Sequence, residues 1–463
     1  MAPPGTPTQT ARVPVVWSIG GMSSAASATS LAQWWSRFDD PLLGTLVEQA
    51  LLNNTDVEHA QAALRQARAL RDVAAAALLP VVGSSGSAQH STSGGHSAGT
   101  TFNAGLDASW EIDVFGANRS ALAASDASAS ASAASLANVR VSIAAEVALA
   151  YIALRNAQTR LNIANENLAT QLETLQITQW RLQAGLVSSL EREQVRAAAE
   201  QTRAQLPLLQ TAIVQTQHAL SVLTGQPPAS LLPVLETATE VPQVRDDLVL
   251  SIPAETLRQR SDVRAAEHNM AAALARVAGA DAARMPSFKL SGSLGLNALT
   301  LGSLGNSAAI VSALLAGVSM PIFNGGALLA QVRAQQAAFE LAQVAYRTAV
   351  LTALTEVEDA LAALRGDRER LVRLMLAADA ASNAALYARQ RFSSGIVDFQ
   401  TVLDTQRTQL STQDSVASAK ADVASDHVRL YKALGGGWLP DAEGVAPATS
   451  PVANELTPQT SSL

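Results

Sequence analysis

The chain has 463 residues, of which 48% are hydrophobic, 4% are aromatic and none is cysteine. Its net charge of −7 and its lack of a basic stripe argue against a nucleic-acid partner, because phosphates are met by clustered Lys and Arg. No unbroken apolar run approaches the ~18 residues of a membrane-spanning helix, so any passage through a membrane would have to be made by strands.

Residues 1–40 are expected to form an extended N-terminal segment, and residues 41–225 a first repeat of helix, two strands, long helix and helix. The strand predicted at 101–112 alternates between apolar and polar residues, which gives it one apolar face. Its apolar members are Phe102, Ala104, Leu106, Ala108, Trp110 and Ile112. The preceding strand, around 81–92, is rich in Ser and Gly and alternates poorly. Strands of about ten residues with this period are typical of membrane β-barrels.

No Gly or Pro occurs between Ala117 and Ala184, so a single helix is predicted through this range. Apolar residues recur in it at alternating steps of four and three, the pattern of helices wound around one another. They are Ile143, Val147, Ala150, Leu154, Ala157, Leu161, Ala164 and Leu168. At about 1.5 Å per residue this helix would span on the order of 100 Å, far more than a globular domain needs.

Residues 226–253 are rich in proline and are predicted to be a linker. A second repeat at 254–438 follows, because motifs of the first half recur: Asp56-Val57 aligns with Asp262-Val263, and Gly185 with Gly395. Its strands are expected at 288–296 and 314–322, before a second long helix. The shorter helices of the two repeats are expected at 41–79, 189–223, 254–284 and 399–434. The tail at 439–463 is dominated by Pro, Ala, Thr and Ser and is expected to be disordered.

Four strands per chain are too few to close a barrel around an aqueous lumen. An open sheet edge in lipid would leave several backbone groups unpaired. Either several copies therefore join into one barrel, or the strands lie outside a membrane. The second possibility leaves a different class of function, a soluble coiled-coil scaffold that associates with itself.

Six short motifs extend this interpretation. They are 35–41 (WSRFDDP), 53–57 (NNTDV), 110–116 (WEIDVFG), 260–265 (RSDVRA), 321–325 (PIFNG) and 431–438 (YKALGGGW). In these motifs the chain resembles the TolC-type outer-membrane efflux channels, and among them the NodT-type lipoprotein branch that serves resistance-nodulation-division (RND) pumps. The resemblance covers roughly residues 34–438.

The resemblance implies a mainly α-helical fold with a membrane β-barrel. Three chains would build a long α-helical barrel and a twelve-stranded β-barrel, with four strands from each chain and an equatorial belt that includes the linker. It places the protein in the bacterial outer membrane, in contact with its lipid, with the helices extending into the periplasm. Members of the branch usually begin at an acylated cysteine. Either such a cysteine lies upstream of Met1 or the barrel alone anchors the protein, and no lipidation site is predicted in this chain.

The function implied is passive conduction of drugs or other small solutes from an inner-membrane RND pump and a periplasmic adaptor, or membrane fusion protein. The same architecture also serves type I protein secretion and metal-ion efflux, which remain alternatives. We expect no enzyme activity, cofactor or metal site, because the six histidines are scattered and no nucleophile elbow or phosphate-binding loop is present.

Two turns are predicted to dock the adaptor, since in the family they lie at the end of the tube furthest from the strands. They comprise Gly185, Leu186, Val187 and Ser188 in the first repeat, and Gly395, Ile396, Val397 and Asp398 in the second. A simpler interpretation is that each glycine only supplies the positive φ angle that ends its helix, and both can hold together.

The periplasmic aperture is predicted at Asp404, Glu191, Gln400 and Gln194, again by the resemblance. Three copies of Asp404 around a narrow pore would form a carboxylate ring that repels its own members and binds cations. Gln400 stands where relatives carry an apolar plug. The alternative for Asp404 is a solvated charge on a helix surface.

Overall fold

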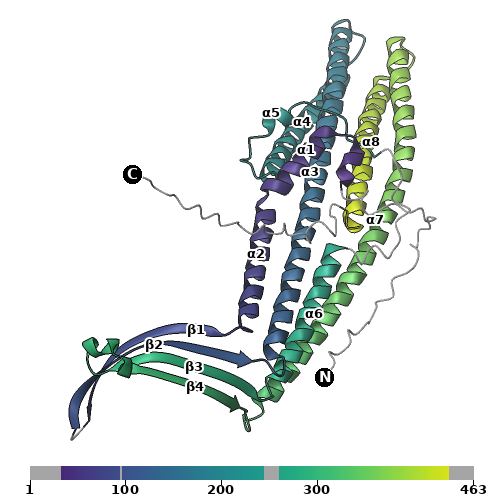
Figure 1. The fold of residues 1–463 in the computed structure, drawn as a ribbon. Coiled ribbons are helices and arrows are strands. Elements are labelled where there is room, and N and C mark those ends of the chain that lie inside the picture. Colours follow the sequence, from purple (N-terminus) through teal and green to yellow (C-terminus); the bar gives the residue numbers. More distant parts are fainter. Residues whose placement is uncertain (1–32, 94–95, 245–259, 437–463) are drawn as a thin grey trace, which may run out of the picture.

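The computed structural model describes residues 33–93, 96–244 and 260–436. A long bundle of helices carries, at one end, a four-stranded sheet that projects to one side (Figure 1). The predicted tail at 439–463 and most of the N-terminal segment lie outside the described residues.

The element order repeats within the chain, as the duplicated sequence predicts. The first half contains α1 (Pro41–Asn53), α2 (Thr55–Ala76), β1 (Val81–Ser93), β2 (His96–Ile112), α3 (Ala117–Gln183) and α4 (Ser189–Leu223). After the one-turn helix α5 (Leu232–Leu235), the second half contains α6 (Ser261–Ala282), β3 (Ser287–Ala298), β4 (Ile310–Ser319), α7 (Ala327–Ser393) and α8 (Phe399–Ala433). The long helices α3 and α7 both have 67 residues, and α4 and α8 both have 35.

The sheet is antiparallel with the order β1-β2-β3-β4, and its register gives it one apolar face. Across β2 and β3 this face pairs Phe102 with Ala298, Ala104 with Leu296, Leu106 with Leu294, Trp110 with Leu290 and Ile112 with Phe288. The opposite face pairs Asp107 with Ser293 and Glu111 with Lys289. Strand alternation therefore predicted the faces of β2 and β3 correctly.

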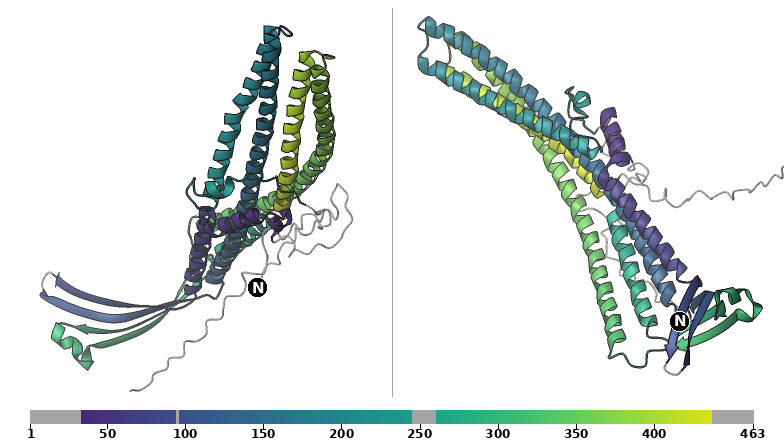
Figure 2. Two further views of the ribbon diagram at one scale, coloured as in Figure 1. Left: turned by 90° about the horizontal axis from the view of Figure 1, so that it is seen from above. Right: turned by 90° about the vertical axis from the view of Figure 1, so that its left-hand side faces the viewer.

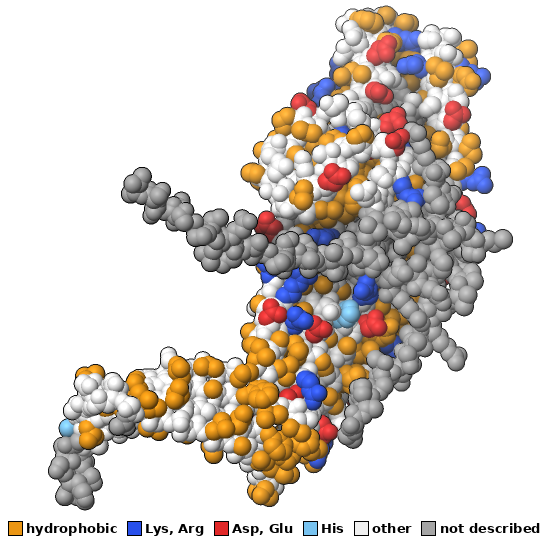
Figure 3. Space-filling view, in the orientation of Figure 1, with side chains coloured by type: hydrophobic (Ala, Val, Ile, Leu, Met, Phe, Trp, Pro, Cys, Tyr) orange, Lys and Arg blue, Asp and Glu red, His pale blue; other side chains and the backbone are white. Residues whose placement is uncertain are grey.

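Strand β4 differs from the expected pattern. Leu314, Ala316 and Val318 share the apolar face as predicted, but the strand ends at Ser319, before Met320 and Ile322. Its other face is also apolar, with Val311, Ala313 and Leu315, and the whole strand is exposed. Figure 3 shows the hydrophobic surface over the sheet and its junction with the helices, while charged side chains gather along the helices.

Helix α3 is the centre of the bundle. It packs against α2 in the half near the sheet and against α4 in the far half, while α6 and α8 lie on it from the second repeat (Figure 2). Most of the predicted seam is buried, including Ile143, Val147, Leu154, Ala157, Ala164 and Leu168. The predicted helix–helix packing is confirmed by these contacts within the chain.

Segments distant in sequence meet at the middle of α3. The Tyr151 hydroxyl donates to Asp40 Oδ2 (2.7 Å) and accepts from Arg155 Nη2 (3.0 Å). Arg155 Nη1 also donates to the carbonyl of Thr237 (2.6 Å) and to Gln158 Oε1 (2.8 Å). Burial, together with the bond to Asp40, raises the pKa of Tyr151 to about 12. This network, the equatorial network, fastens the N-terminal segment and the linker to the middle of the bundle.

Three expectations need correction. Residues 34–38, expected to be extended, form a 3-10 helix that buries Trp34, Trp35 and Phe38. The helix expected at 41–79 breaks at Asn54, whose side chain accepts from the backbone of Asp56.

The third correction concerns membrane-spanning helices. One helix among the described residues, α3, is long and apolar enough to cross a membrane, although 56% of its most apolar 18-residue segment is buried inside the chain. The many alanines of α3 raise its average hydropathy although it contains no long unbroken apolar run. A buried core helix of a protein can have the same length and average hydropathy.

Candidate functional site: the helix tips

The turn between α3 and α4 lies at the end of the bundle furthest from the sheet (Figure 1). Gly185 has φ 73°, and the amide of Leu186 bonds back to the carbonyl of Arg181 (2.8 Å), which closes the end of α3. Glu191 Oε2 accepts from the amide of Ser188 (2.5 Å), so it caps the start of α4.

The turn between α7 and α8 repeats this geometry at the equivalent residues. Gly395 also has φ 73°, and the amide of Ile396 bonds to the carbonyl of Arg391 (2.9 Å). Asp398 caps α8 by accepting from the Thr401 amide (3.0 Å) and hydroxyl. These bonds from Thr401 lower the pKa of Asp398, which stays ionised at the tip.

Both turns present an apolar side chain to solvent. Leu186 is 73% exposed and Ile396 is 70% exposed, whereas the valines that follow them are half-buried. A Cβ added at Gly185 or Gly395 would meet no other group within 4 Å. Lack of space for a side chain is therefore not the reason that glycine occupies these positions. The positive φ angle is the reason that glycine occupies both positions. The side chains of Leu186 and Ile396 remain exposed.

Contacts between the hairpins hold the two tips together. The Arg181 guanidinium lies 4.3 Å from the centre of the Phe392 ring, and Phe392 packs edge-on against Phe399 at 5.3 Å. Val195 and Leu403 complete a small buried cluster with Phe399. The α3–α4 and α7–α8 hairpins therefore form one packed unit at this end.

The aperture candidates lie one or two turns inside the tips. Gln400 Nε2 donates to Asp404 Oδ1 (3.1 Å), and Arg407 Nη1 lies 3.8 Å from the same oxygen. All three side chains are exposed on one face of α8. Gln400 and Asp404 therefore lie side by side on α8. Arg407 was missed by the sequence analysis, although its i+3 spacing from Asp404 was the available signal.

Glu191 and Gln194 occupy a different helix, α4, and are half-buried. Because the Glu191 carboxylate is bonded to the Ser188 amide, it does not join Asp404 within one chain. Its capping bond is a structural role that the family resemblance did not indicate.

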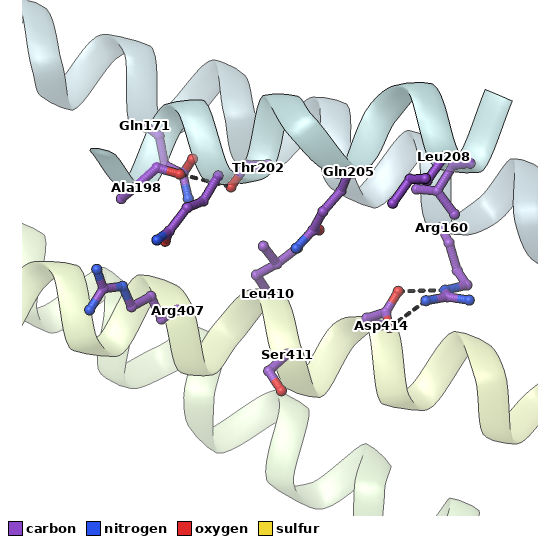
Figure 4. Close-up of a pocket in the computed structure, with 13 residues that line it drawn as sticks. Arg160, Gln171, Ala198, Thr202, Gln205, Leu208, Arg407, Leu410, Ser411 and Asp414 are labelled. Carbon is purple, nitrogen blue, oxygen red and sulfur yellow. Dashed lines mark hydrogen bonds and ion pairs between the residues drawn. The ribbon is translucent and has the colours of Figure 1, made fainter. Parts of the chain in front are cut away.

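A cavity of about 440 Å³ lies between α3, α4 and α8, further from the tips (Figure 4). At one end Arg160 of α3 binds Asp414 of α8 through two bonds, Nε to Oδ1 (2.6 Å) and Nη2 to Oδ2 (3.0 Å). Gln171 and Gln205 also line it. The ion pair between Arg160 and Asp414 connects the two hairpins at this cavity, which is a feature of packing and not of a reaction site. No cluster of potential metal ligands occurs among the described residues.

Comparison with known proteins agrees with this architecture. The family model described as outer membrane efflux protein matches residues 46–226 and 252–436. The chain is 34% identical over 456 residues to the pyoverdine export outer membrane protein OpmQ of Pseudomonas putida, covering 95% of each chain. It is 28% identical over 459 residues to nodulation protein T of Rhizobium leguminosarum, covering 96% of this chain and 94% of the relative.

Solved structures show the same fold. The outer-membrane channel OprN superposes with a TM-score of 0.84 at 36% identity, covering 92% of this chain and 98% of that one. The open state of the Neisseria gonorrhoeae MtrE outer membrane channel gives a TM-score of 0.81 at 29% identity, covering 92% and 96%.

These matches confirm the resemblance read from the motifs, and they exclude the soluble scaffold. Members of the matched family are transporters and not enzymes. The chain belongs to the outer membrane efflux protein family, and it is the outer-membrane channel component of an efflux system, with its long helices in the periplasm.

Proposed function

We propose that three copies of this chain close into one continuous duct, which passively conducts small solutes from an inner-membrane RND pump and a periplasmic adaptor to the outside. The observation that carries the proposal is the sheet: β1 and β4 each lack a neighbour on one side. Within lipid these edges would leave backbone groups unpaired, at a cost of several kcal/mol for each group, and only closure removes these edges.

The flanks of the chain fit such a ring. Helix α2 precedes edge strand β1 and exposes Leu70 and Val73, while α7 follows edge strand β4 and exposes Leu341 and Val344. The four side chains are 57% to 72% exposed. If β4 of one copy pairs with β1 of the next, these apolar surfaces approach each other around the ring. Such a head-to-tail interface closes when the rotation per copy divides a full turn.

Cysteine pairs test the ring, because the chain has no native cysteine. Ser85→Cys on β1 should be combined in turn with cysteines along β4, including Ala313→Cys. We expect oxidation in outer membranes to yield a species with the mass of three chains for pairs in register. A matched pair on the inner strands, Ser109→Cys with Ser291→Cys, should link only within one chain. Failure of every β1–β4 pair to link chains would contradict the proposed closure.

The turns are proposed to receive the adaptor. The support is their position at the far end of the helices and the exposure of Leu186 and Ile396. A photo-crosslinker at Ser188 or Asp398 in intact cell envelopes should capture a periplasmic adaptor associated with an RND pump. A crosslinker at exposed Leu52, far from the tips, is the control. Capture of only other copies of this chain would remove the docking assignment.

Asp404 is proposed to form a charged ring at the aperture, with Gln400 and Arg407 beside it. Since three carboxylates facing a narrow pore attract cations and restrict the opening, Asp404→Ala should raise single-channel conductance severalfold and lower cation selectivity. The measurement is conductance in planar bilayers under a salt gradient. Asp379→Ala, at an exposed position on α7, is the control. Unchanged conductance and selectivity would assign Asp404 to the solvated helix surface.

The solutes are proposed to be small organic molecules. Relatives are named for export of pyoverdine and for efflux of toluene, the latter 30% identical to this chain over 414 residues.

A further inference from the structure

The two hairpins differ sharply at one level of the bundle. In the second hairpin, Asp367 and Arg368 of α7 face Asp426 and His427 of α8. The repeat-equivalent residues of the first hairpin are uncharged: Ala157 and Gln158 on α3, and Thr216 and Gln217 on α4. There the two glutamines both donate to the carbonyl of Leu235. At these equivalent positions the first seam therefore has no titratable side chain, whereas the second has three acidic or histidine groups, Asp367, Asp426 and His427.

Asp426 is the most deeply buried acid of this seam. Its side chain is 1% exposed, and its Oδ1 accepts from Arg429 Nη1 (2.7 Å). Its Oδ2 is buried and has no hydrogen-bond donor among the described residues. Asp367 faces Asp426 across the seam, because the neighbouring Arg368 contacts His427 (2.9 Å) and Arg370 joins Asp367 to Asp422, one turn from Asp426. A carboxyl group can donate to another only when one of the two is protonated.

The other charged groups around the pair are already engaged. Arg370 of α7 bridges Asp367 (3.5 Å) and Asp422 of α8 (3.1 Å). His427 Nδ1 lies 2.8 Å from the carbonyl of Val423, so it donates there, and Nε2 accepts from Arg368 Nη2 at 2.9 Å. On α3, which also packs against α8, Tyr151 and Arg155 are bonded within the equatorial network.

We propose that Asp367 and Asp426 share a proton, and that this shared proton makes the contact between α7 and α8 tighter in mild acid than at neutral pH. Burial is the main reason, and with the neighbouring Asp367 it raises the pKa of Asp426 to about 6, although Arg429 opposes the shift. Because the folded-state pKa lies above the ordinary value near 4, protonation stabilises the folded seam. That contribution is complete below about pH 4 and is lost as the pH rises through about 6.

The inference concerns pairing within one chain and does not depend on ring closure or conduction. Its consequence is that the hairpin carrying Asp398 and Asp404 has a pH response at this level, which the uncharged equivalent positions of the hairpin carrying Ser188 and Glu191 cannot give. Because α7 and α8 are long, a change in their packing at this seam would also change the distance between the two helices near the tip.

Infrared difference spectroscopy of the full-length protein in detergent tests the proton directly. Ordinary carboxyl groups are ionised by pH 5.5, so a protonated-carboxyl band that disappears with a midpoint near pH 6 is expected from the pair. Asp426→Asn should abolish this step, because the amide keeps the bond from Arg429 but cannot titrate. Asp422→Asn, an exposed acid one turn away, should leave the band unchanged.

Hydrogen exchange provides the second measurement. After correction for intrinsic rates, backbone exchange around Asp426, in the C-terminal third of α8, should be severalfold slower at pH 5.5 than at pH 7.5 in the parent protein, and equal at the two values in Asp426→Asn. Exchange in α4 should not change. If Asp426→Asn fails to fold, Asp367→Asn serves instead. A parent protein without the band, or a band that persists in both variants, would overturn the proposal.

Discussion

Replacing Gly225 with alanine is expected to prevent stable folding, whereas the same change at Gly185 should be tolerated. Both glycines have φ 73°, so alanine is strained by about 1–2 kcal/mol at either position. At Gly225 the added Cβ would also lie 2.2 Å from the carbonyl oxygen of Asn53. At Gly185 it would meet nothing within 4 Å.

The close contact in Gly225→Ala cannot relax cheaply, because the added Cβ meets the backbone carbonyl of Asn53 and not the end of a flexible side chain. Relief would move the end of α4 away from the junction of α1 and α2, where Asn54 Nδ2 donates to the carbonyl of Leu223 (3.0 Å). We expect a total loss of about 3 kcal/mol or more for Gly225→Ala. Thermal unfolding followed by circular dichroism, together with the amount recovered from outer membranes, measures it. Similar melting temperatures for the two variants would show that the close approach at Asn53 does not constrain the fold.

The second large effect is expected at Arg155. Arg155→Ala removes a guanidinium that is 2% exposed and leaves the Thr237 carbonyl and the Gln158 amide oxygen without their donor. Breaking a buried charged network typically costs about 3–5 kcal/mol. The linker should detach from α3, so residues 232–237 should become accessible to protease before the variant unfolds.

The repeat supplies the control for this prediction. The residue equivalent to Arg155 in α7 is Arg365, which is 67% exposed and pairs with Glu369 on the same helix. Arg365→Ala should change stability by no more than about 0.5 kcal/mol. Equal losses at the two arginines would mean that helix propensity, and not the equatorial network, determines the effect.

Much of the fold follows from local patterns in the sequence. The absence of Gly and Pro predicted the limits of α3 within one residue, and two-residue alternation predicted the faces of β2 and β3. The break at Asn54 was missed because one residue in extended conformation does not interrupt the surrounding helical composition. The poor alternation of 81–92 made β1 uncertain, yet its pairing with β2 runs along most of its length, because a neighbouring strand supplies the order that its own side chains do not.

The site was predicted less completely. The two glycine turns were found because they need a positive φ angle, which the sequence marks directly. Arg407 beside Asp404 was overlooked, and Glu191 proved to cap α4. Roles of this kind depend on which neighbour a side chain reaches, and a family resemblance transfers position but not bonding partners.

The sequence by itself determined the duplication, the limits of α3 and the faces of the central strands, because these depend on periodicities and backbone restrictions within a few residues. The tertiary structure decided which groups meet. Tyr151 reaches Asp40 across 111 positions, and Asp426 faces Asp367 where the first repeat has Thr216 and Ala157. Burial and charge pairing are set by packing between distant segments, and equivalent positions in the two repeats therefore acquired different physical chemistry.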